Sequence, residues 1–211
     1  TLSHSGYVKS QPLSEYRAQK RGGRGKQAAA TKDEDWIDQL FIANTHDTIL
    51  CFSDRGRLYW LKVWEVPQGT RSSRGKPIVN MCPLAEHEKI TVVLPIKQYD
   101  ALHFVFMATA MGTVKKTPLS DFANPRKAGI IAVNLDESDY LIGVNITDGS
   151  CDVMLFSDGG KAVRFAEDDV RPMGRTARGV RGMMLEDGQA VIYMLVAADE
   201  QLNVLTATEN G

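Results

Sequence analysis

Short apolar runs separated by polar turns dominate the sequence, and helical periodicity is weak throughout. Residues 49–52 and 58–61 are two neighbouring runs rich in β-favouring side chains, and the polar tip Ser53-Asp54-Arg55-Gly56 lies between them. A polar tip that ends on glycine is typical of a β-hairpin, because glycine accepts the positive φ of a bulged turn. The same pattern recurs around Gly112 and Gly160. Later apolar runs predict further strands at residues 90–94, 140–144 and 190–196.

The hairpin is one part of a longer repeat. Its anchor glycines lie 50, 56, 48 and 51 residues apart, at Gly6, Gly56, Gly112, Gly160 and Gly211. Each complete copy has an acid nine positions after the anchor and an apolar residue ten positions after it; the acids are Glu15, Glu65, Asp121 and Asp169. Repeats of this length, each with about four strands, predict an all-β, propeller-like array whose blades stack because one blade cannot bury both faces of its sheet. The alternative is a large irregular sandwich, which does not require equal spacing.

The composition is that of a globular protein, with 43% hydrophobic and 24% charged residues. No apolar run reaches the roughly 18 residues that a membrane helix needs. The three cysteines are widely spaced and form no CxxC pair, so we expect buried, reduced thiols in a cytoplasmic protein. The chain begins without Met or a signal-peptide pattern, and we expect residues 1–211 to be a single domain truncated at both ends.

The charge is unevenly distributed although the net charge is only −1. Residues 1–32 carry seven cations and one acid, whereas acids dominate elsewhere. This asymmetry predicts a molecule with one basic face.

A second glycine with a neighbouring cation recurs once in each copy, about 19 residues after the hairpin glycine in three of the four copies. We name these segments the first to fourth basic loops: residues 19–26, 71–76, 126–129 and 175–181. Their candidate DNA-binding cations are Lys20, Arg21, Arg24 and Lys26, then Arg71, Arg74 and Lys76, then Arg126 and Lys127, and finally Arg175, Arg178 and Arg181. Equivalent loops on successive blades would form a curved positive track, which matches the evenly spaced phosphates of a bent duplex. The alternative is four solvated turns.

The first basic loop contains a motif with three cations and three glycines in seven residues: Gln19, Lys20, Arg21, Gly22, Gly23, Arg24 and Gly25. Glycine lets backbone N–H groups approach a phosphate, and the forked donors of Arg match phosphate oxygens. This heptad, which we call the box, resembles the motif that marks the C-terminal domain of the A subunits of DNA gyrase. Shorter stretches across the chain resemble the same family, among them residues 6–9, 74–80 and 206–211.

The resemblance implies a β-pinwheel in which blades exchange strands, with about four blades covered here of a probable six. It also implies that the domain binds and wraps double-stranded DNA around its basic rim, so that an ATP-dependent type II topoisomerase can introduce negative supercoils. The implied partners, in an A2B2 enzyme of the bacterial cytoplasm, are the gyrase B subunit together with the N-terminal part of the gyrase A polypeptide. The box distinguishes this family from the related topoisomerase IV domain, in which it is lost or degenerate.

No catalytic set is found, and the resemblance places the cleavage tyrosine in the N-terminal part of the gyrase A polypeptide. We expect no cofactor in this chain, with ATP and Mg on the partner B polypeptide. Gly25-Lys26-Gln27 fails the P-loop pattern, and the four histidines lack metal-ligand spacing. Glu167-Asp168-Asp169 is interpreted as a solvated turn rather than a metal site. Trp60 and Trp64 are expected in the core or between blades.

Two alternative functions stay open at this stage. The chain could be the topoisomerase IV counterpart, which the intact box argues against. It could also be a propeller that serves as a protein-interaction module, in which case it would show no salt-dependent affinity for DNA. A propeller enzyme is disfavoured by the missing catalytic groups.

Overall fold

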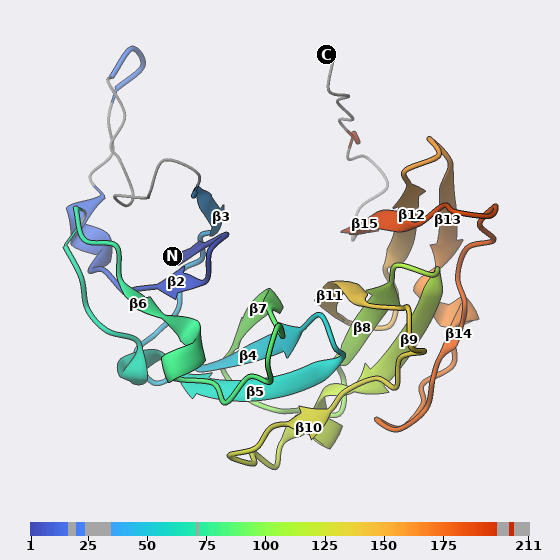
Figure 1. The fold of residues 1–211 in the computed structure, drawn as a ribbon, viewed down its shortest axis with the longest axis horizontal. Helices are drawn as coiled ribbons and strands as arrows, with labels where there is room; N and C mark the ends of the chain where they lie inside the picture. The colour runs from blue at the N-terminus through green and yellow to red at the C-terminus, as the bar shows by residue number, and fades with distance from the viewer. Residues whose placement is uncertain (17–19, 24–34, 71, 198–202, 205–211) are drawn as a thin grey trace.

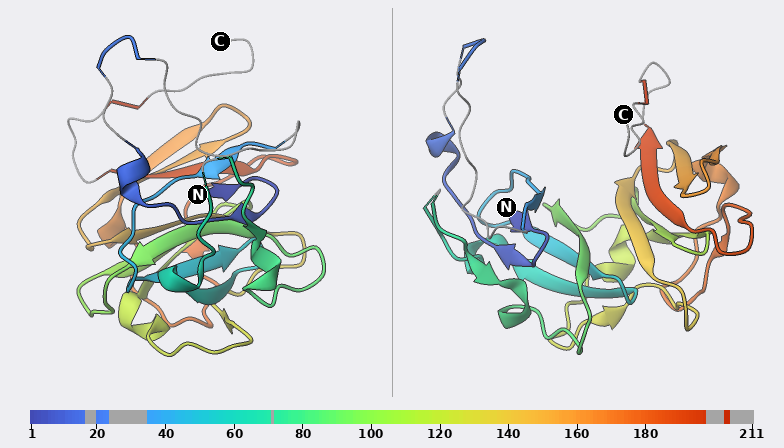
Figure 2. Two further views of the ribbon diagram at one scale, coloured as in Figure 1. Left: turned by 90° about the vertical axis from the view of Figure 1, so that its left-hand side faces the viewer. Right: turned by 45° about the horizontal axis from the view of Figure 1, so that its top comes forward.

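The computed structural model describes residues 1–16, 20–23, 35–70, 72–197 and 203–204. These residues form antiparallel sheets that follow one another around an open arc (Figure 1), with short 3-10 helices between strands. The right-hand view of Figure 2 shows the same opening between the first and the fourth sheet. The all-β architecture predicted from the repeat is confirmed.

Each copy of the repeat contributes one sheet to the arc. The first sheet has the order β3 (Ile37–Gln39), β1 (Leu2–Ser3), β2 (Tyr7–Val8) and β6 (Lys76–Pro77). The second has the order β7 (Ile90–Ile96), β4 (Thr48–Ser53), β5 (Arg57–Lys62) and β10 (Ile130–Ile131). The third has the order β11 (Leu141–Thr147), β8 (Phe104–Thr109), β9 (Thr113–Pro118) and β14 (Val180–Arg181). The described residues of the fourth give β15 (Val191–Ala197), β12 (Asp152–Ser157) and β13 (Ala162–Ala166).

Neighbouring sheets are joined by strand exchange. The outermost strand of each of the first three sheets comes from the next copy of the repeat: β6 pairs with β2, β10 with β5 and β14 with β9. The pairs are equivalent, as Val8↔Lys76, Leu58↔Ile130 and Val114↔Val180 show. The inner strand β11 contacts β7 and β15 of its neighbours. Each copy therefore completes the sheet before it, which is how the blades of a pinwheel are connected.

The hydrophobic core lies between the sheets. On β4, Leu50 and Phe52 pack towards the third sheet, whereas Ile49 and Cys51 pack towards the first. The period of two in a strand allows this, because successive side chains point to opposite faces. A third cluster, which includes Phe106 and Leu155, joins the third sheet to the fourth. Both faces of the two middle sheets are therefore buried by their neighbours.

The predicted hairpins are present, and their glycines also serve the strand exchange. The N–H of Gly56 donates to the Ser53 carbonyl at 3.0 Å, and Gly56 has a φ of +70°. The Gly56 carbonyl accepts N–H groups from Ala132 and Val133, just after the exchanged strand β10. A Cβ on Gly56 would lie 2.6 Å from the Val133 carbonyl oxygen. Glycine is thus required here both by the turn and by the segment that covers it.

The acid of each repeat lies in a 3-10 helix just after the hairpin. These helices are η1 (Leu13–Glu15), η2 (Val63–Glu65), η4 (Leu119–Phe122) and η5 (Glu167–Asp169), while η3 (Ile78–Asn80) follows β6. The residue seven positions after the anchor glycine opens each of the four, and it is Leu13, Val63, Leu119 or Glu167. The fourth copy therefore has a carboxylate where the others have an apolar side chain.

The prediction that residues 167–169 form a solvated turn is wrong for Glu167, which is 0% exposed. Its carboxylate accepts the Thr147 hydroxyl at 2.6 Å and the Gly149 N–H at 3.1 Å. The ammonium of Lys116, 2% exposed, lies 3.9 Å from the carboxylate and donates to the Glu167 carbonyl at 3.1 Å. A charged residue is accommodated at this otherwise apolar repeat position for two reasons. Strand β9 of the preceding copy supplies a buried cation, and residues 147–151 supply hydrogen-bond donors.

The tryptophan prediction is half right. Trp60 is partly buried in the cluster between the second and third sheets and donates its indole N–H to the Phe122 carbonyl at 3.1 Å. Trp64 is 63% exposed, because it lies in η2 rather than on a strand and its helix places it outside the sheet. All three cysteines are buried and free, as expected.

The turn assignment predicts a difference between two equivalent glycines. Gly56→Val should lower the free energy of unfolding by more than about 3 kcal/mol, because it combines positive-φ strain with a clash against the Val133 carbonyl. Gly160→Val is the matched control: Gly160 has a φ of +74°, but nothing lies within 4 Å of its Cβ position, so only the strain of about 1–2 kcal/mol applies. Urea denaturation measures both, and equal losses would contradict the proposed clash.

The buried pair predicts a second stability effect. Glu167→Ala should lower the free energy of unfolding by about 3–5 kcal/mol, because Lys116 is left as an uncompensated buried charge. Replacing both partners, with Lys116→Met and Glu167→Leu, should recover most of this loss, since Leu restores the residue type found at Leu13 and Leu119. Thermal and urea unfolding followed by circular dichroism test the pair, and an unchanged Glu167→Ala variant would show that the ion pair contributes nothing.

Candidate nucleic-acid interface

The second, third and fourth basic loops lie at the outer edge of the arc because of their positions in the topology. The second loop runs directly into β6, the third into β10, and the fourth contains β14. These three strands are the outermost strands of their sheets. In Figure 1 the connections that lead into β6, β10 and β14 follow the convex side of the arc. Strand exchange thus places one basic loop at the outer end of each sheet boundary.

The glycines of the second and fourth basic loops have a packing role. Gly75 has a φ of +93°, and a Cβ there would lie 2.4 Å from the Val8 carbonyl oxygen of β2. Gly179 meets the Val114 carbonyl of β9 in the same way, at 2.5 Å. Close approach of the loop to the preceding sheet therefore explains the glycines. This close approach does not explain the neighbouring cations, because their side chains take no part in these contacts.

The structure leaves nearly all of the described candidate cations in solvent. Arg175 is half-buried, and the exposed residues are Lys20, Arg21, Arg74, Lys76, Arg126, Lys127, Arg178 and Arg181. Gly22 and Gly23 are exposed as well, and Gly22 has a positive φ of 87°. Gln19, Arg24, Gly25, Lys26 and Arg71 lie outside the described residues. The described part of the interface is thus a row of exposed side chains that can meet an anionic ligand.

Two of these cations, Arg178 and Arg74, make only weak interactions within the protein. Arg178 contacts Asp136 at 3.0 Å, and both side chains are largely exposed. The guanidinium of Arg74 lies over the Tyr7 ring, 5.4 Å from its centre. Exposed ion pairs contribute little to stability, so exchanging such a partner for a phosphate costs little.

The first, second and fourth basic loops share one backbone turn. The N–H of Gly23 donates to the Lys20 carbonyl at 3.0 Å, and Ser73 to Thr70 at 3.0 Å. Ala177 and Gly174 make the same bond at 3.1 Å in the fourth copy. The described part of the box therefore adopts the turn of the later loops.

Sequence reasoning missed the cations beneath these loops, Lys9 and Lys115. Burial lowers the pKa of Lys9, which Glu15 partly opposes. Burial, and after it the charge of Arg175, lowers the pKa of Lys115 to about 8, and Asp121 acts in the opposite direction. The available signal was that both lysines stand three positions after an anchor glycine, Lys9 directly after a strand and Lys115 within one.

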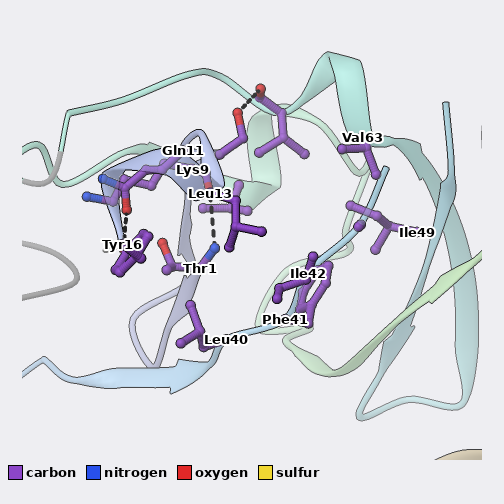
Figure 3. Close-up of a pocket in the computed structure, with 14 residues that line it drawn as sticks. Thr1, Lys9, Gln11, Leu13, Tyr16, Leu40, Phe41, Ile42, Ile49 and Val63 are labelled. Atoms are coloured by element: carbon purple, nitrogen blue, oxygen red, sulfur yellow. Dashed lines mark hydrogen bonds between the residues drawn. The ribbon is translucent and has the colours of Figure 1, made fainter. Parts of the chain in front are cut away.

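A pocket of about 370 Å³ lies beside β2 and is lined mainly by apolar side chains, including Leu13, Leu40, Phe41 and Ile42 (Figure 3). Among the described residues, none of the candidate cations lines this pocket, and its lining side chains form no nucleophile–base pair. A separate cluster of Asp148, Cys151 and Glu167 has the spacing of a metal site. However, Asp148 accepts the Ser150 N–H and hydroxyl, and Glu167 accepts the donors described above. Hydrogen bonds within the protein thus account for this cluster.

Four antiparallel sheets follow one another around an arc, and the following copy supplies the outer strand of each of the first three. This arrangement defines a β-pinwheel of the propeller class. The sequence model of the family "DNA gyrase C-terminal domain, beta-propeller" matches residues 1–44, 47–97, 103–148 and 152–198, which correspond to the four copies. The chain belongs to this family.

Curated relatives support the same family assignment. The chain is 60% identical over 211 residues to the DNA gyrase A protein of Klebsiella oxytoca and 55% identical over 211 residues to that of Escherichia coli strain K12. Both matches cover 100% of this chain and 24% of the relative, so the chain spans about a quarter of the length of these proteins.

Two solved structures share the fold. The C-terminal domain of DNA topoisomerase IV gives a TM-score of 0.80 at 29% identity, covering 94% of this chain and 60% of that one. A DNA gyrase A C-terminal domain gives 0.72 at 28% identity, covering 92% and 63%. Fold similarity therefore does not separate gyrase from topoisomerase IV, whereas the family and the curated relatives favour gyrase. No helix among the described residues is long and apolar enough to cross a membrane.

Proposed function

We propose that the outer edge of this domain binds duplex DNA and bends it along the arc, so that the parent gyrase can introduce negative supercoils. The observation that carries the proposal is the recurrence of exposed cations in equivalent loops at successive sheet boundaries. Phosphates are evenly spaced along a duplex, so equally spaced cations on a convex edge suit a curved backbone path. Such contacts position DNA without reading its sequence.

Bending explains why several loops are needed. Bending a site of about 20–30 bp by 40–90° costs on the order of 1–6 kcal/mol. Contacts at one loop could bind DNA but could not hold both ends of a bent segment. Cations distributed over the second, third and fourth loops can offset the bending cost along the path. The box, with its three cations, is proposed to fasten the end of the wrap that lies at the first sheet.

In the intact protein, this domain would deliver the wrapped segment to a DNA gate formed by other parts of the enzyme. The proposed assembly is an A2B2 type II topoisomerase, with ATP and Mg on the B polypeptide and the cleavage tyrosine in the N-terminal part of the A polypeptide. The identity with DNA gyrase A proteins over the whole chain supports this role.

A salt titration tests the phosphate contacts. Wild-type affinity for random duplexes should fall with salt at a log–log slope of roughly −0.9 per neutralised phosphate. Arg74→Ala and Lys127→Ala should each reduce the steepness of the slope by about one and weaken all duplexes alike. Lys97→Ala is the control, because Lys97 is exposed beside the inner strand β7. A flat salt response would contradict the proposal and favour a protein-interaction module. A marked preference for one DNA sequence would contradict the proposed phosphate contacts.

A topology assay separates wrapping from binding. Replacing Lys20, Arg21 and Arg24 with Ala should remove the linking-number shift seen when nicked circles are bound and ligated, while DNA binding persists through Arg74, Lys127 and Arg178. In the intact enzyme, supercoiling should be lost and relaxation retained, because the cleavage gate is elsewhere. A control variant with Ala at the exposed Lys89, Lys97 and Lys161 removes the same charge. A full wild-type shift from the box variant would refute the role of the box.

A further inference from the structure

Two lysines at equivalent positions of the repeat are buried at the base of the basic loops. Lys9 and Lys115 each stand three positions after an anchor glycine, and each is 1% exposed. Burying an ammonium group is costly unless its donors are satisfied. Each side chain has at least one acceptor in the next copy of the repeat, so the contact crosses a sheet boundary.

The second basic loop folds around Lys9. The ammonium donates to the carbonyl oxygens of Thr70 at 2.9 Å and Ser73 at 2.8 Å, immediately before Arg74. Gly69 and Gly75 pass close to the lysine stem, since a Cβ on either would lie 3.2 and 3.1 Å from its carbon atoms. Figure 3 shows Lys9 on the segment that also carries Gln11, beside the apolar pocket. The loop backbone therefore depends on this side chain for its shape.

The fourth basic loop repeats this arrangement around Lys115. Its ammonium donates to the Ala132 carbonyl at 2.7 Å and to the carbonyl of Arg175 itself. Met173 N–H bonds the Lys116 carbonyl at 2.8 Å, and Gly69 N–H bonds the equivalent Ser10 carbonyl at 3.0 Å in the second loop. Two loops 104 residues apart, as Gly75 and Gly179 show, are thus built in the same way.

The third basic loop uses a different cation for the same purpose. Tyr59 occupies the position of Lys9 and Lys115, and its ring lies under Gly129. Arg57 donates its Nε–H to the Tyr59 hydroxyl at 3.0 Å and its terminal N–H to the Ala128 carbonyl at 2.7 Å. Ala128 follows Lys127 directly, so a cation of the preceding sheet again binds a loop carbonyl beside the exposed charge.

We propose that Lys9, Arg57 and Lys115 are positioning residues that hold the basic loops in a DNA-binding shape, an inference that rests on the proposed function. The charged group of each residue lies beneath its loop and binds loop carbonyl oxygens, which therefore point away from solvent. An approaching phosphate then meets the exposed Arg and Lys side chains rather than carbonyl dipoles. Because the loop is ordered before DNA arrives, binding loses less conformational entropy. The residue that binds each loop belongs to the preceding sheet. The conformation of the loop therefore depends on correct packing between the two sheets.

A double-mutant cycle in the full-length gyrase A protein tests this. Lys115→Met should weaken binding of a random duplex about fivefold, measured where circular dichroism shows the variant folded. In an Arg175→Ala, Arg178→Ala background the same change should cost less than about twofold, because the arginines through which Lys115 acts are gone. Hydrogen exchange of residues 172–179 should be faster in Lys115→Met. Lys116→Met is the matched control: this lysine is equally buried but bonds Glu167 instead of a basic loop, so it should destabilise the fold without changing DNA affinity.

The possible outcomes distinguish the positioning role of Lys115 from the proposed DNA-binding function. If Lys115→Met binds like the wild type, or if its cost is unchanged without the arginines, Lys115 is purely structural and the inference is overturned while DNA binding stands. If the wild type shows no salt-dependent binding, both proposals fail. Should Lys115→Met not fold, Arg57→Gln paired with Lys127→Ala gives the same cycle at the third loop, where Arg57 is only partly buried. Additive losses there would overturn the inference as well.

Discussion

The structure depends on the pairing of a two-residue strand with the sheet of the preceding copy. β6, β10 and β14 are too short to be stable alone, but a loop glycine before each of them, Gly75, Gly129 or Gly179, allows close backbone approach to the preceding sheet. This pairing links the sheets in sequence and brings their inner faces into contact. It also decides where the loops go, because the segment that enters the outermost strand must run along the outer edge.

Polar groups at the sheet boundaries specify which sheets pack against each other, which apolar packing alone would not determine. The boundary between the third and fourth sheets contains the Lys116–Glu167 pair, and Lys9 and Lys115 lie under the loops of the following copies. Similar apolar faces could pack in several orders. A buried cation is satisfied only where its acceptors are present, so a wrong pairing of blades would leave it without partners. These residues can therefore distinguish one boundary from another.

The basic edge of the molecule exists despite a net charge of −1. Strand exchange repeats the same loop at each boundary, exposed cations repeat with it, and the four basic loops contain no acidic residue. A local track of positive charge is what a phosphate backbone meets, since charges beyond a Debye length of roughly 10 Å are largely screened. Architecture rather than composition thus creates the proposed DNA path.

Much of the fold was evident from the chain alone. The recurrence of Gly6, Gly56, Gly112 and Gly160 at intervals of 50, 56 and 48 residues indicated the blades. The strands and hairpin turns followed from local pattern, because turn geometry and strand periodicity are short-range properties. The candidate cations of the loops were likewise readable, and those described are nearly all exposed. Tertiary structure alone decided which copy completes which sheet, why Glu167 is buried while Trp64 is exposed, and that Lys9 and Lys115 support the loops. The physical reason is that burial and hydrogen bonding at these positions depend on partners that lie 17 to 64 residues away in the sequence, which no local pattern specifies.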